Sequence, residues 1–241
     1  MSPRTGLAAL LPLLVLVAAG CGDGSSRQEG PDPAPDPGAT VAALDCAEPP
    51  APPAEVAAFG QDDLPDPWSG ADQVDATIRT TCGDVVVELA AAQAPQTVAS
   101  FTFLAEQGWW EDSPCHRLTT SGIFVLQCGD PTGTGRGNPG YGYGIENAPA
   151  DGTYPAGTLA MARTQDPQSN GGQFFVVWED SQLPTQGGGY SIFGRVTEGL
   201  DVVRAIAAQG VEGGAADGAP AQPVSILEVE VEVEVEVDEG R

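Results

Sequence analysis

Short stretches in which apolar and polar residues alternate recur from about residue 71 to the end of the chain. Such alternation is typical of β-strands with one face buried and the other in water. Eight strands are predicted, at residues 74–80, 85–89, 115–119, 123–127, 157–162, 173–178, 191–196 and 224–237. The turn-like residues 81–84 make a hairpin of the first two strands.

Two other segments have helical periodicity. Residues 95–107 start with a proline, place apolar side chains three and four positions apart, and stop before Gly108. Residues 200–209 repeat the pattern between Gly199 and Gly210. Short strands with turn-rich joins and two helices predict a mainly β fold. We expect a closed, eight-stranded antiparallel barrel capped by the two helices.

The first 20 residues are typical of a bacterial lipoprotein signal peptide. Arg4 precedes an apolar run from Leu7 to Ala19, which is too short for a membrane span, and small residues lead to Cys21. In such signals the cysteine thiol becomes the lipid attachment point. We therefore expect an exported chain anchored through Cys21 to the outer face of the bacterial cytoplasmic membrane. The alternative is an ordinary secretory signal with an unrelated cysteine.

Residues 21–70 have the composition of a spacer. The stretch from Gly22 to Gly70 holds ten of the 22 prolines and little large apolar material. Such a segment cannot bury enough surface to offset the entropy of ordering it. We expect a disordered, semi-extended linker over residues 21–70 that holds a folded domain, residues 71–241, away from the membrane.

Charge and composition exclude several kinds of chemistry. The formal net charge is −25, and the basic residues are nine arginines with no lysine. P-loop and lysine Schiff-base mechanisms are therefore excluded, and binding to nucleic acid is strongly disfavoured. A single histidine, His116, rules out sites with several histidines, so no metal or cofactor is expected.

Two local features could in principle serve a cofactor or catalysis. Residues 135–140 match the spelling GxGxxG, but Pro139, Gly142 and Gly144 prevent a following helix, so we interpret the stretch as a glycine-rich loop. His116 could serve a hydrolase, although the chain has no GxSxG nucleophile motif. A hydrolase is therefore kept only as a third hypothesis.

Five fragments, taken together, resemble a known family. They are CHR at 115–117, FVLQCGD at 124–130, LAMA at 159–162, NGGQFF at 170–175 and IFGRV at 192–196. In this order and spacing they resemble the cyclophilins, peptidyl-prolyl cis/trans isomerases with an eight-stranded barrel. The resemblance spans roughly residues 72–237.

The resemblance implies a set of site residues. Arg117 takes the place of the catalytic arginine, and Gln127 and Gln173 match the glutamines that position it and the substrate. The implied substrate-binding residues are Phe124, Val125, Gln127, Ala162, Arg163, Gln173, Phe175, Leu183 and Tyr190. Three of them depart from the family pattern, since Val125 replaces a methionine, Arg163 an asparagine and Tyr190 a histidine.

The leading hypothesis is an isomerase that accelerates rotation about X-Pro bonds in exported proteins and so assists their folding. Its partners would be proline-containing segments, and we expect a monomer that needs no cofactor. The alternative is a cyclophilin-like module that binds proline peptides with little turnover, which the three departures would favour.

Four cysteines remain besides Cys21. Cys46, Cys82, Cys115 and Cys128 form an even set in an exported chain, for which disulfides are the default. Cys115 and Cys128 lie on adjacent predicted strands, so we favour that pair, which leaves Cys46 to join Cys82. A register with Arg117 opposite Gln127 sets Cys115 opposite Gly129 instead, so this pairing requires a bulge or twist.

Overall fold

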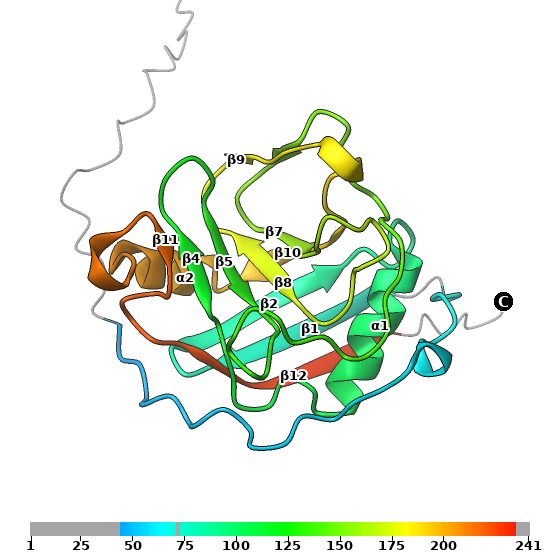
Figure 1. Cartoon of the computed structure of the whole chain (residues 1–241), viewed down its shortest axis with the longest axis horizontal. Helices are drawn as coiled ribbons and strands as arrows, with labels where there is room; N and C mark the ends of the chain where they lie inside the picture. The colour runs from blue at the N-terminus through cyan, green and yellow to red at the C-terminus, as the bar shows by residue number, and fades with distance from the viewer. Residues whose placement is uncertain (1–43, 71–72, 235–241) are drawn as a thin grey trace, which may run out of the picture. The chain divides into compact units, whose positions relative to one another are not determined.

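The computed structural model describes residues 44–70 and 73–234. The fold is mainly β, and its largest element is a curled β-sheet (Figure 1). The ten strands of the sheet are β1 (Gln73–Thr80), β2 (Gly83–Leu89), β3 (Ser113–Pro114), β4 (Arg117–Thr119), β5 (Val125–Cys128), β7 (Thr158–Met161), β8 (Phe174–Val177), β10 (Ile192–Glu198), β11 (Asp217–Gly218) and β12 (Ser225–Glu234). Two further strands, β6 (Thr153–Tyr154) and β9 (Ser181–Gln182), pair separately.

The two predicted helices are confirmed as α1 (Pro95–Glu106) and α2 (Leu200–Ala208). Proline occupies the first turn of α1, where its missing N–H has no intrahelical partner to lose. Gly199 precedes α2 with a φ of 83°, a conformation that favours glycine. Three short 3-10 helices complete the elements: η1 (Gln61–Asp63), η2 (Gln186–Gly188) and η3 (Glu212–Gly214).

The prediction of a closed, eight-stranded barrel is wrong. The strands follow the open order β11-β4-β5-β8-β7-β10-β2-β1-β12-β3, which makes a ten-stranded half-barrel. Of the expected strand at 115–119, only residues 117–119 form a strand, β4, which pairs with β5. The short strand β3 lies just upstream and pairs with β12. The backbone stays bonded beside β12 as far as Cys115 and turns to pair with β5 only from Arg117.

Aromatic side chains fill the space between α1 and the sheet. The ring of Phe101 lies 4.6 Å from Trp110, 5.8 Å from Phe174 and 5.3 Å from Phe193, measured between centroids. All four side chains are buried. This cluster makes a firm support for the strands, because truncating one such ring typically costs about 3–5 kcal/mol.

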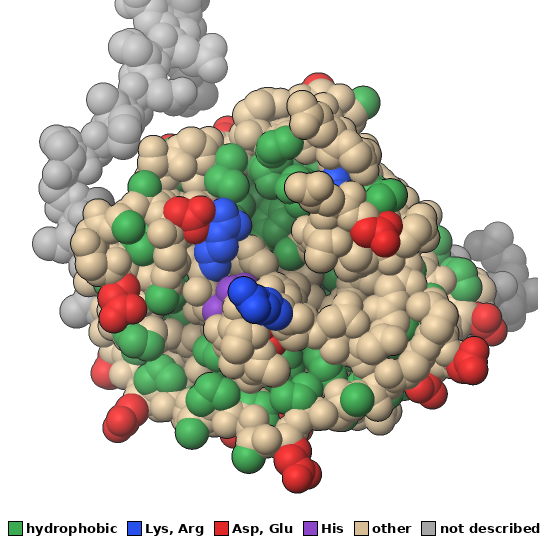
Figure 2. Space-filling model, viewed as in Figure 1, with side chains coloured by type: hydrophobic (Ala, Val, Ile, Leu, Met, Phe, Trp, Pro, Cys, Tyr) green, Lys and Arg blue, Asp and Glu red, His purple; other side chains and the backbone are tan. Residues whose placement is uncertain are grey.

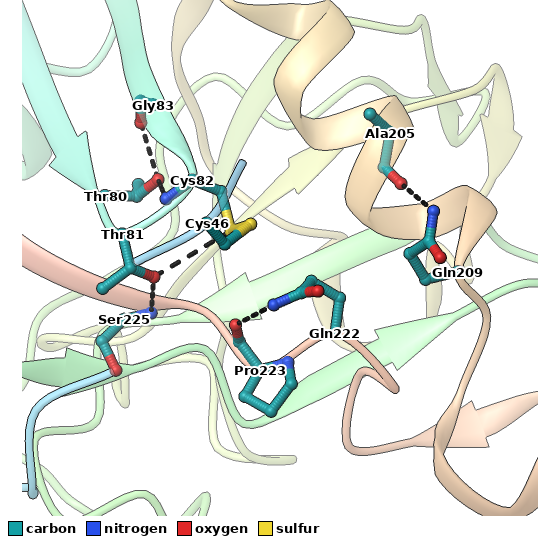
Figure 3. Close-up of a disulfide and its surroundings, with 10 residues drawn as sticks. All are labelled: Cys46, Thr80, Thr81, Cys82, Gly83, Ala205, Gln209, Gln222, Pro223 and Ser225. Atoms are coloured by element: carbon teal, nitrogen blue, oxygen red, sulfur yellow. Dashed lines mark hydrogen bonds between the residues drawn. A yellow bond between two sulfur atoms is a disulfide. The ribbon is translucent and has the colours of Figure 1, made fainter. Parts of the chain in front are cut away.

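The two disulfides form the favoured pairing, Cys46 with Cys82 (Figure 3) and Cys115 with Cys128. The predicted register with Arg117 opposite Gln127 is also confirmed. Both can hold because the backbone leaves the β4 ladder at Cys115, whose N–H donates to Val224 O at 2.9 Å. The irregularity that the pairing required is therefore the break between β3 and β4.

Residues 44–70, which we expected to belong to a disordered linker, pack on the domain. Backbone N–H groups of Ala47, Phe59 and Trp68 donate to carbonyls of residues 81, 139 and 95 at 2.7–3.0 Å. Apolar side chains of the segment rest against the core: Leu44, Val56, Phe59, Leu64 and Trp68. The folded unit therefore includes more of the chain than composition indicated.

The signal peptide, Cys21, the start of the linker and the last residues of the predicted final strand lie outside the described residues. Within residues 44–70 and 73–234, no helix combines the length and apolar character needed to cross a bilayer.

Candidate active site

One row of side chains crosses five neighbouring strands. Arg117 of β4 pairs with Gln127 of β5, which pairs with Phe175 of β8. The row continues through Ala160 of β7 to Ile192 of β10. Directly opposed residues in a sheet project to the same face. The register therefore places a guanidinium, an amide and an aromatic ring side by side.

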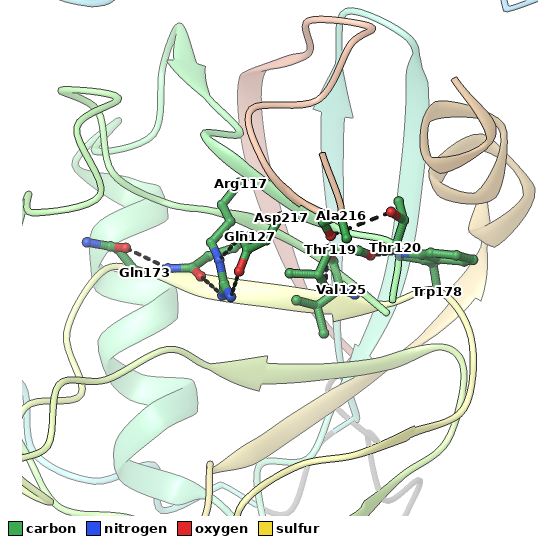
Figure 4. Close-up of polar contacts among 9 residues, drawn as sticks. All are labelled: Arg117, Thr119, Thr120, Val125, Gln127, Gln173, Trp178, Ala216 and Asp217. Atoms are coloured by element: carbon green, nitrogen blue, oxygen red, sulfur yellow. Dashed lines mark hydrogen bonds and ion pairs between the residues drawn. The ribbon is translucent and has the colours of Figure 1, made fainter. Parts of the chain in front are cut away.

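Arg117 and Gln127, the two polar members of this row, form a chain of hydrogen bonds with the neighbouring Gln173 (Figure 4). Arg117 Nη1 donates to Gln127 Oε1 at 3.2 Å, and Gln127 Nε2 donates to Gln173 Oε1 at 3.0 Å. Gln173 Nε2 in turn donates to the Gly137 carbonyl at 2.9 Å. The glutamines are thus oriented from both ends, and Arg117 is held at one end of the chain.

Asp217 binds the guanidinium of Arg117 from the other side. Nε and Nη2 of Arg117 donate to Oδ1 and Oδ2 of Asp217 at 2.7 and 2.8 Å, a two-point contact. This hydrogen bonding is the main cause that raises the pKa of Arg117 and lowers the pKa of Asp217. Arginine has five N–H groups, so one remains on each terminal nitrogen for a ligand.

The strand pairing explains how Asp217 reaches Arg117 from 100 residues away. Asp217 and Gly218 form β11, which pairs with Thr119 and Leu118 of β4. Thr120 N also donates to Ala216 O at 2.9 Å. Three consecutive backbone positions therefore fasten the carboxylate beside the guanidinium.

An apolar pocket adjoins this polar chain. The buried members of its side-chain cluster are Val125, Tyr154, Ala160, Phe175, Val177 and Leu183, and the partly buried members are Ile123, Ala162, Tyr190 and Ile192. Figure 2 shows a hollow with hydrophobic walls beside arginine side chains on this face. The structure thus brings Val125, Ala162, Phe175, Leu183 and Tyr190 together. Phe124 lies apart, with its ring 5.0 Å from that of Trp178.

Arg163 does not present its charge to the pocket. Its Nε, Nη1 and Nη2 donate to the carbonyls of Gly189, Thr164 and Gln186 at 2.7–3.1 Å. The guanidinium also lies 5.1 Å from the centroid of the Tyr190 ring. Arg163 therefore fixes the η2 loop and Tyr190, and its side chain contacts backbone groups of this chain.

A second, more polar cavity of about 310 Å³ continues from Gln127 and Gln173. Its other walls come from the glycine-rich loop at 135–138, from residues 162–164 and from Ser169, Gly171 and Gly172. The exposed side chain of Arg136 lies at this cavity. Ala162 lines this cavity and also belongs to the apolar cluster, so the two adjoin.

His116 lies near Arg117 without joining a catalytic hydrogen-bond network. Among the described residues its buried Nδ1 has no hydrogen-bond partner. Burial lowers the pKa of His116, Asp130 opposes this shift, and Arg117 adds to it. Asp130 is committed elsewhere, since its carboxylate accepts hydrogen bonds from Thr132, Thr134 and Arg136. These contacts give no support to a hydrolase that uses His116.

Comparison with known proteins agrees with this geometry. The family model described as cyclophilin type peptidyl-prolyl cis-trans isomerase/CLD matches residues 75–231. The chain belongs to the cyclophilin family.

Two curated proteins from mycobacteria are similar to this chain. The probable peptidyl-prolyl cis-trans isomerase B of Mycobacterium tuberculosis is 44% identical over 172 residues, covering 65% of this chain and 54% of that protein. The Mycobacterium leprae protein of the same name is 42% identical over 167 residues, covering 64% and 55%. The chain thus spans about half the length of these curated relatives.

Solved cyclophilin structures resemble the fold. A crystal structure of a Cryptosporidium parvum cyclophilin type peptidyl-prolyl cis-trans isomerase matches with a TM-score of 0.57 and 27% identity, covering 68% of this chain and 99% of that one. A second crystal structure of that enzyme, in the presence of the dipeptide Ala-Pro, matches with a TM-score of 0.56 and 28% identity, covering 66% and 99%.

Asp217 is the site residue of this cyclophilin that the sequence did not reveal. It stands in the stretch Gly213 to Gly218, where small residues give neither strand nor helix periodicity. An acidic residue in such a loop is ordinary in a chain with 34 Asp and Glu residues. Only the pairing of β11 with β4 distinguishes it from the others.

Proposed function

We propose that this cyclophilin is a peptidyl-prolyl cis/trans isomerase that acts on X-Pro bonds. The observation that carries the proposal is the position of Arg117, which Gln127 and Asp217 hold beside a pocket lined by Val125, Phe175 and Leu183. This combination places a fixed hydrogen-bond donor next to apolar side chains of the kind that would contact a proline ring.

The reaction needs a hydrogen-bond donor to the prolyl nitrogen and a site that binds the proline ring. Rotation about the peptide bond meets a barrier of roughly 18–20 kcal/mol, because it breaks amide resonance. In the twisted state the prolyl nitrogen becomes pyramidal and can accept a hydrogen bond. A remaining N–H of Arg117 would donate to it, which stabilises the twisted state more than either planar isomer.

We assign the other residues by where they lie. Phe175, Val125, Leu183 and Ala162 would hold the proline ring while the acyl side turns. Gln127 would orient Arg117, and Gln173 would bind the substrate backbone with its remaining hydrogen-bonding capacity. Tyr190 replaces a family histidine and offers an aromatic hydroxyl, and its ring lies 5.7 Å from that of Phe175.

We further propose that the substrates are proline-containing segments of exported proteins. The similar Cryptosporidium enzyme crystallised in the presence of Ala-Pro supports a proline peptide as ligand. The signal sequence ending at Cys21 supports export and a lipid anchor on the outer face of the cytoplasmic membrane. The chain would act there as a monomer.

A peptide-binding module with little turnover is the second candidate. The observation that favours it is the two-point contact with Asp217, which occupies two of the N–H groups of Arg117. Isomerisation of a tetrapeptide with a central Ala-Pro bond, measured beside a binding titration, distinguishes the two. Acceleration by catalytic amounts of the chain supports the enzyme, whereas binding without acceleration supports the module.

A further inference from the structure

The glycine-rich loop belongs to a longer stretch, residues 133–144, and its residues 135–138 form one wall of the polar cavity beside the candidate site. Six of the twelve residues of this stretch are glycine. Gly133, Gly135 and Gly140 have φ values of 67°, 74° and 109°, and the loop contains no helix. Glycine retains wide conformational freedom in the unfolded chain, so ordering such a loop is entropically expensive. Its conformation must therefore be held by contacts from elsewhere.

One set of contacts comes from within the domain. The Asp130 carboxylate accepts a hydrogen bond from Arg136 N at 3.0 Å, and Gly137 O accepts one from Gln173. These contacts hold residues 136 and 137, at the wall of the cavity. In the following stretch, residues 139–142, the buried Tyr141 hydroxyl lies 2.9 Å from Ser100 Oγ of α1. The backbone on both sides of Tyr141 is held from a different direction.

That second set comes from residues 56–64, which we call the strap. Phe59 N donates to Pro139 O at 2.7 Å. The Gln61 side chain makes a reciprocal pair with Gly142: its Nε2 donates to Gly142 O at 3.1 Å, and its Oε1 accepts from Gly142 N at 3.2 Å. The backbone at Gly140 lies so close to the Phe59 carbonyl that any side chain there would collide with it.

The strap is itself fixed to the domain independently of the loop. The Phe59 ring lies 5.1 Å from that of Phe103 in α1 and 6.0 Å from that of Trp109. Upstream, the Cys46–Cys82 disulfide attaches the segment to the β1–β2 turn. Downstream, Trp68 N donates to Pro95 O at 3.0 Å. Figure 1 shows this blue to cyan segment running along the domain toward α1.

The strap lies outside residues 75–231, the part of the chain that the family model matches. We infer that the strap holds the glycine-rich loop in the conformation that lines the substrate cavity, with Phe59 and Gln61 as positioning residues. The part that concerns substrate rests on the proposed function. A segment outside the matched range thereby tunes peptide binding without contributing a group to the bond that rotates.

The test compares two neighbouring substitutions in the intact chain. Gln61→Ala removes both bonds to Gly142, whereas Asp62→Ala changes an exposed side chain of the same turn that has no hydrogen bond in the described residues. Amide hydrogen exchange is read at residues 135–138, which Gln61 does not contact. We expect faster exchange there in Gln61→Ala and the parent rate in Asp62→Ala. Unchanged exchange in Gln61→Ala overturns the inference.

Peptide titrations test the consequence for substrate. For Gln61→Ala we expect the dissociation constant of Ala-Ala-Ala-Pro-Ala to rise roughly threefold to tenfold, the range for losing hydrogen bonds of ordinary strength. The dissociation constant of the dipeptide Ala-Pro should stay at the parent value, because Ala-Pro is too short to reach far along the cavity. Faster exchange with unchanged affinity for both peptides overturns the link between the loop and substrate.

A second variant separates local loosening from unfolding. Phe59→Ala removes the ring that fixes the strap but retains the backbone N–H that bonds to Pro139. We expect it to raise exchange at residues 135–138 while the buried amides of β5 and β8 stay protected. A parent chain that fails to accelerate isomerisation would contradict the proposed function alone, because the exchange measurements need no substrate.

Discussion

At the scale of single residues, the arrangement around Arg117 is a balance between holding the guanidinium and leaving it available. Gln127 and Asp217 occupy three of its N–H groups, and the side chain keeps 37% of its exposure. A long arginine side chain loses considerable rotamer entropy when it is fixed. Fixing it before substrate arrives moves that cost from the reaction to folding, which is the general benefit of a preorganised donor.

Replacing Asp217 tests this positioning. Asp217→Asn preserves size but removes the charge and one acceptor, so we expect kcat/KM for a proline tetrapeptide to fall about twofold to fivefold, the range for a solvent-exposed ion pair. Peptide affinity should change less than turnover. The control is Glu212→Gln, which changes an exposed carboxylate of the neighbouring 3-10 helix. Equal activity in the two variants would show that Asp217 does not position Arg117.

At the scale of elements, strand register builds the site. The alternation of apolar and polar residues predicted strands at β1, β2, β4, β5, β7, β8, β10 and β12. The register with Arg117 opposite Gln127, considered from the motifs, is the one the structure has. A strand pairs locally with the neighbour that its hydrophobic face requires, so pattern is sufficient for these elements.

Other features depend on contacts that no local pattern specifies. The two-residue strand β11 is too short to show periodicity, so the pairing that brings Asp217 to Arg117 could not be predicted. Likewise, the proline-rich composition of residues 44–70 predicted a disordered linker, although five of its apolar side chains pack on the core. Apart from the single turn η1, the disulfide at Cys46 and hydrogen bonds to distant carbonyls order this segment.

The Cys115–Cys128 disulfide supports the break between β3 and β4. Its cysteines are 13 positions apart and both are buried. Replacing both with alanine should lower the free energy of unfolding by about 3 kcal/mol, the entropic estimate for a loop of this order. Urea unfolding under oxidising conditions measures this loss. A double variant as stable as the parent would show that the bond adds nothing to the fold.

At the scale of the whole molecule, a formal charge of −25 surrounds a site whose working residue is positive. The Asp217 contact raises the pKa of Arg117 further, so the donor stays charged over the whole physiological range. Activity should accordingly depend little on pH near neutrality, whereas stability should depend on the buried groups whose pKa values are shifted.

His116 gives one such dependence. Burial lowers its pKa below the ordinary value of 6.5, so below that pH the unfolded chain binds a proton more readily than the folded chain. The stability that neutral His116 contributes is therefore present above pH 6.5 and lost as pH falls through the folded-state pKa. Urea unfolding from about pH 7.5 to about pH 5 should show the parent losing stability relative to His116→Asn. A difference that is constant with pH would contradict this assignment.

The proposed anchor is tested in the producing cell. Cys21→Ser removes the thiol that would carry the lipid, so the protein should leave the membrane fraction or accumulate unprocessed. A diacyl anchor holds a protein stably, whereas removing it leaves no comparable attachment. Unchanged membrane fractionation of the variant, with an unmodified Cys21 in the parent, would contradict the lipoprotein proposal.

The central claim is that Arg117 stabilises the twisted peptide bond while the apolar pocket binds both planar forms. The most direct measurement is the isomerisation rate and the dissociation constant of one proline tetrapeptide, for the parent and for Arg117→Ala. Circular dichroism confirms that each is folded. We expect the rate constant to fall about a hundredfold to a thousandfold, as for loss of one preorganised donor, with a much smaller change in affinity. A folded Arg117→Ala chain that isomerises the peptide at the parent rate would contradict the account.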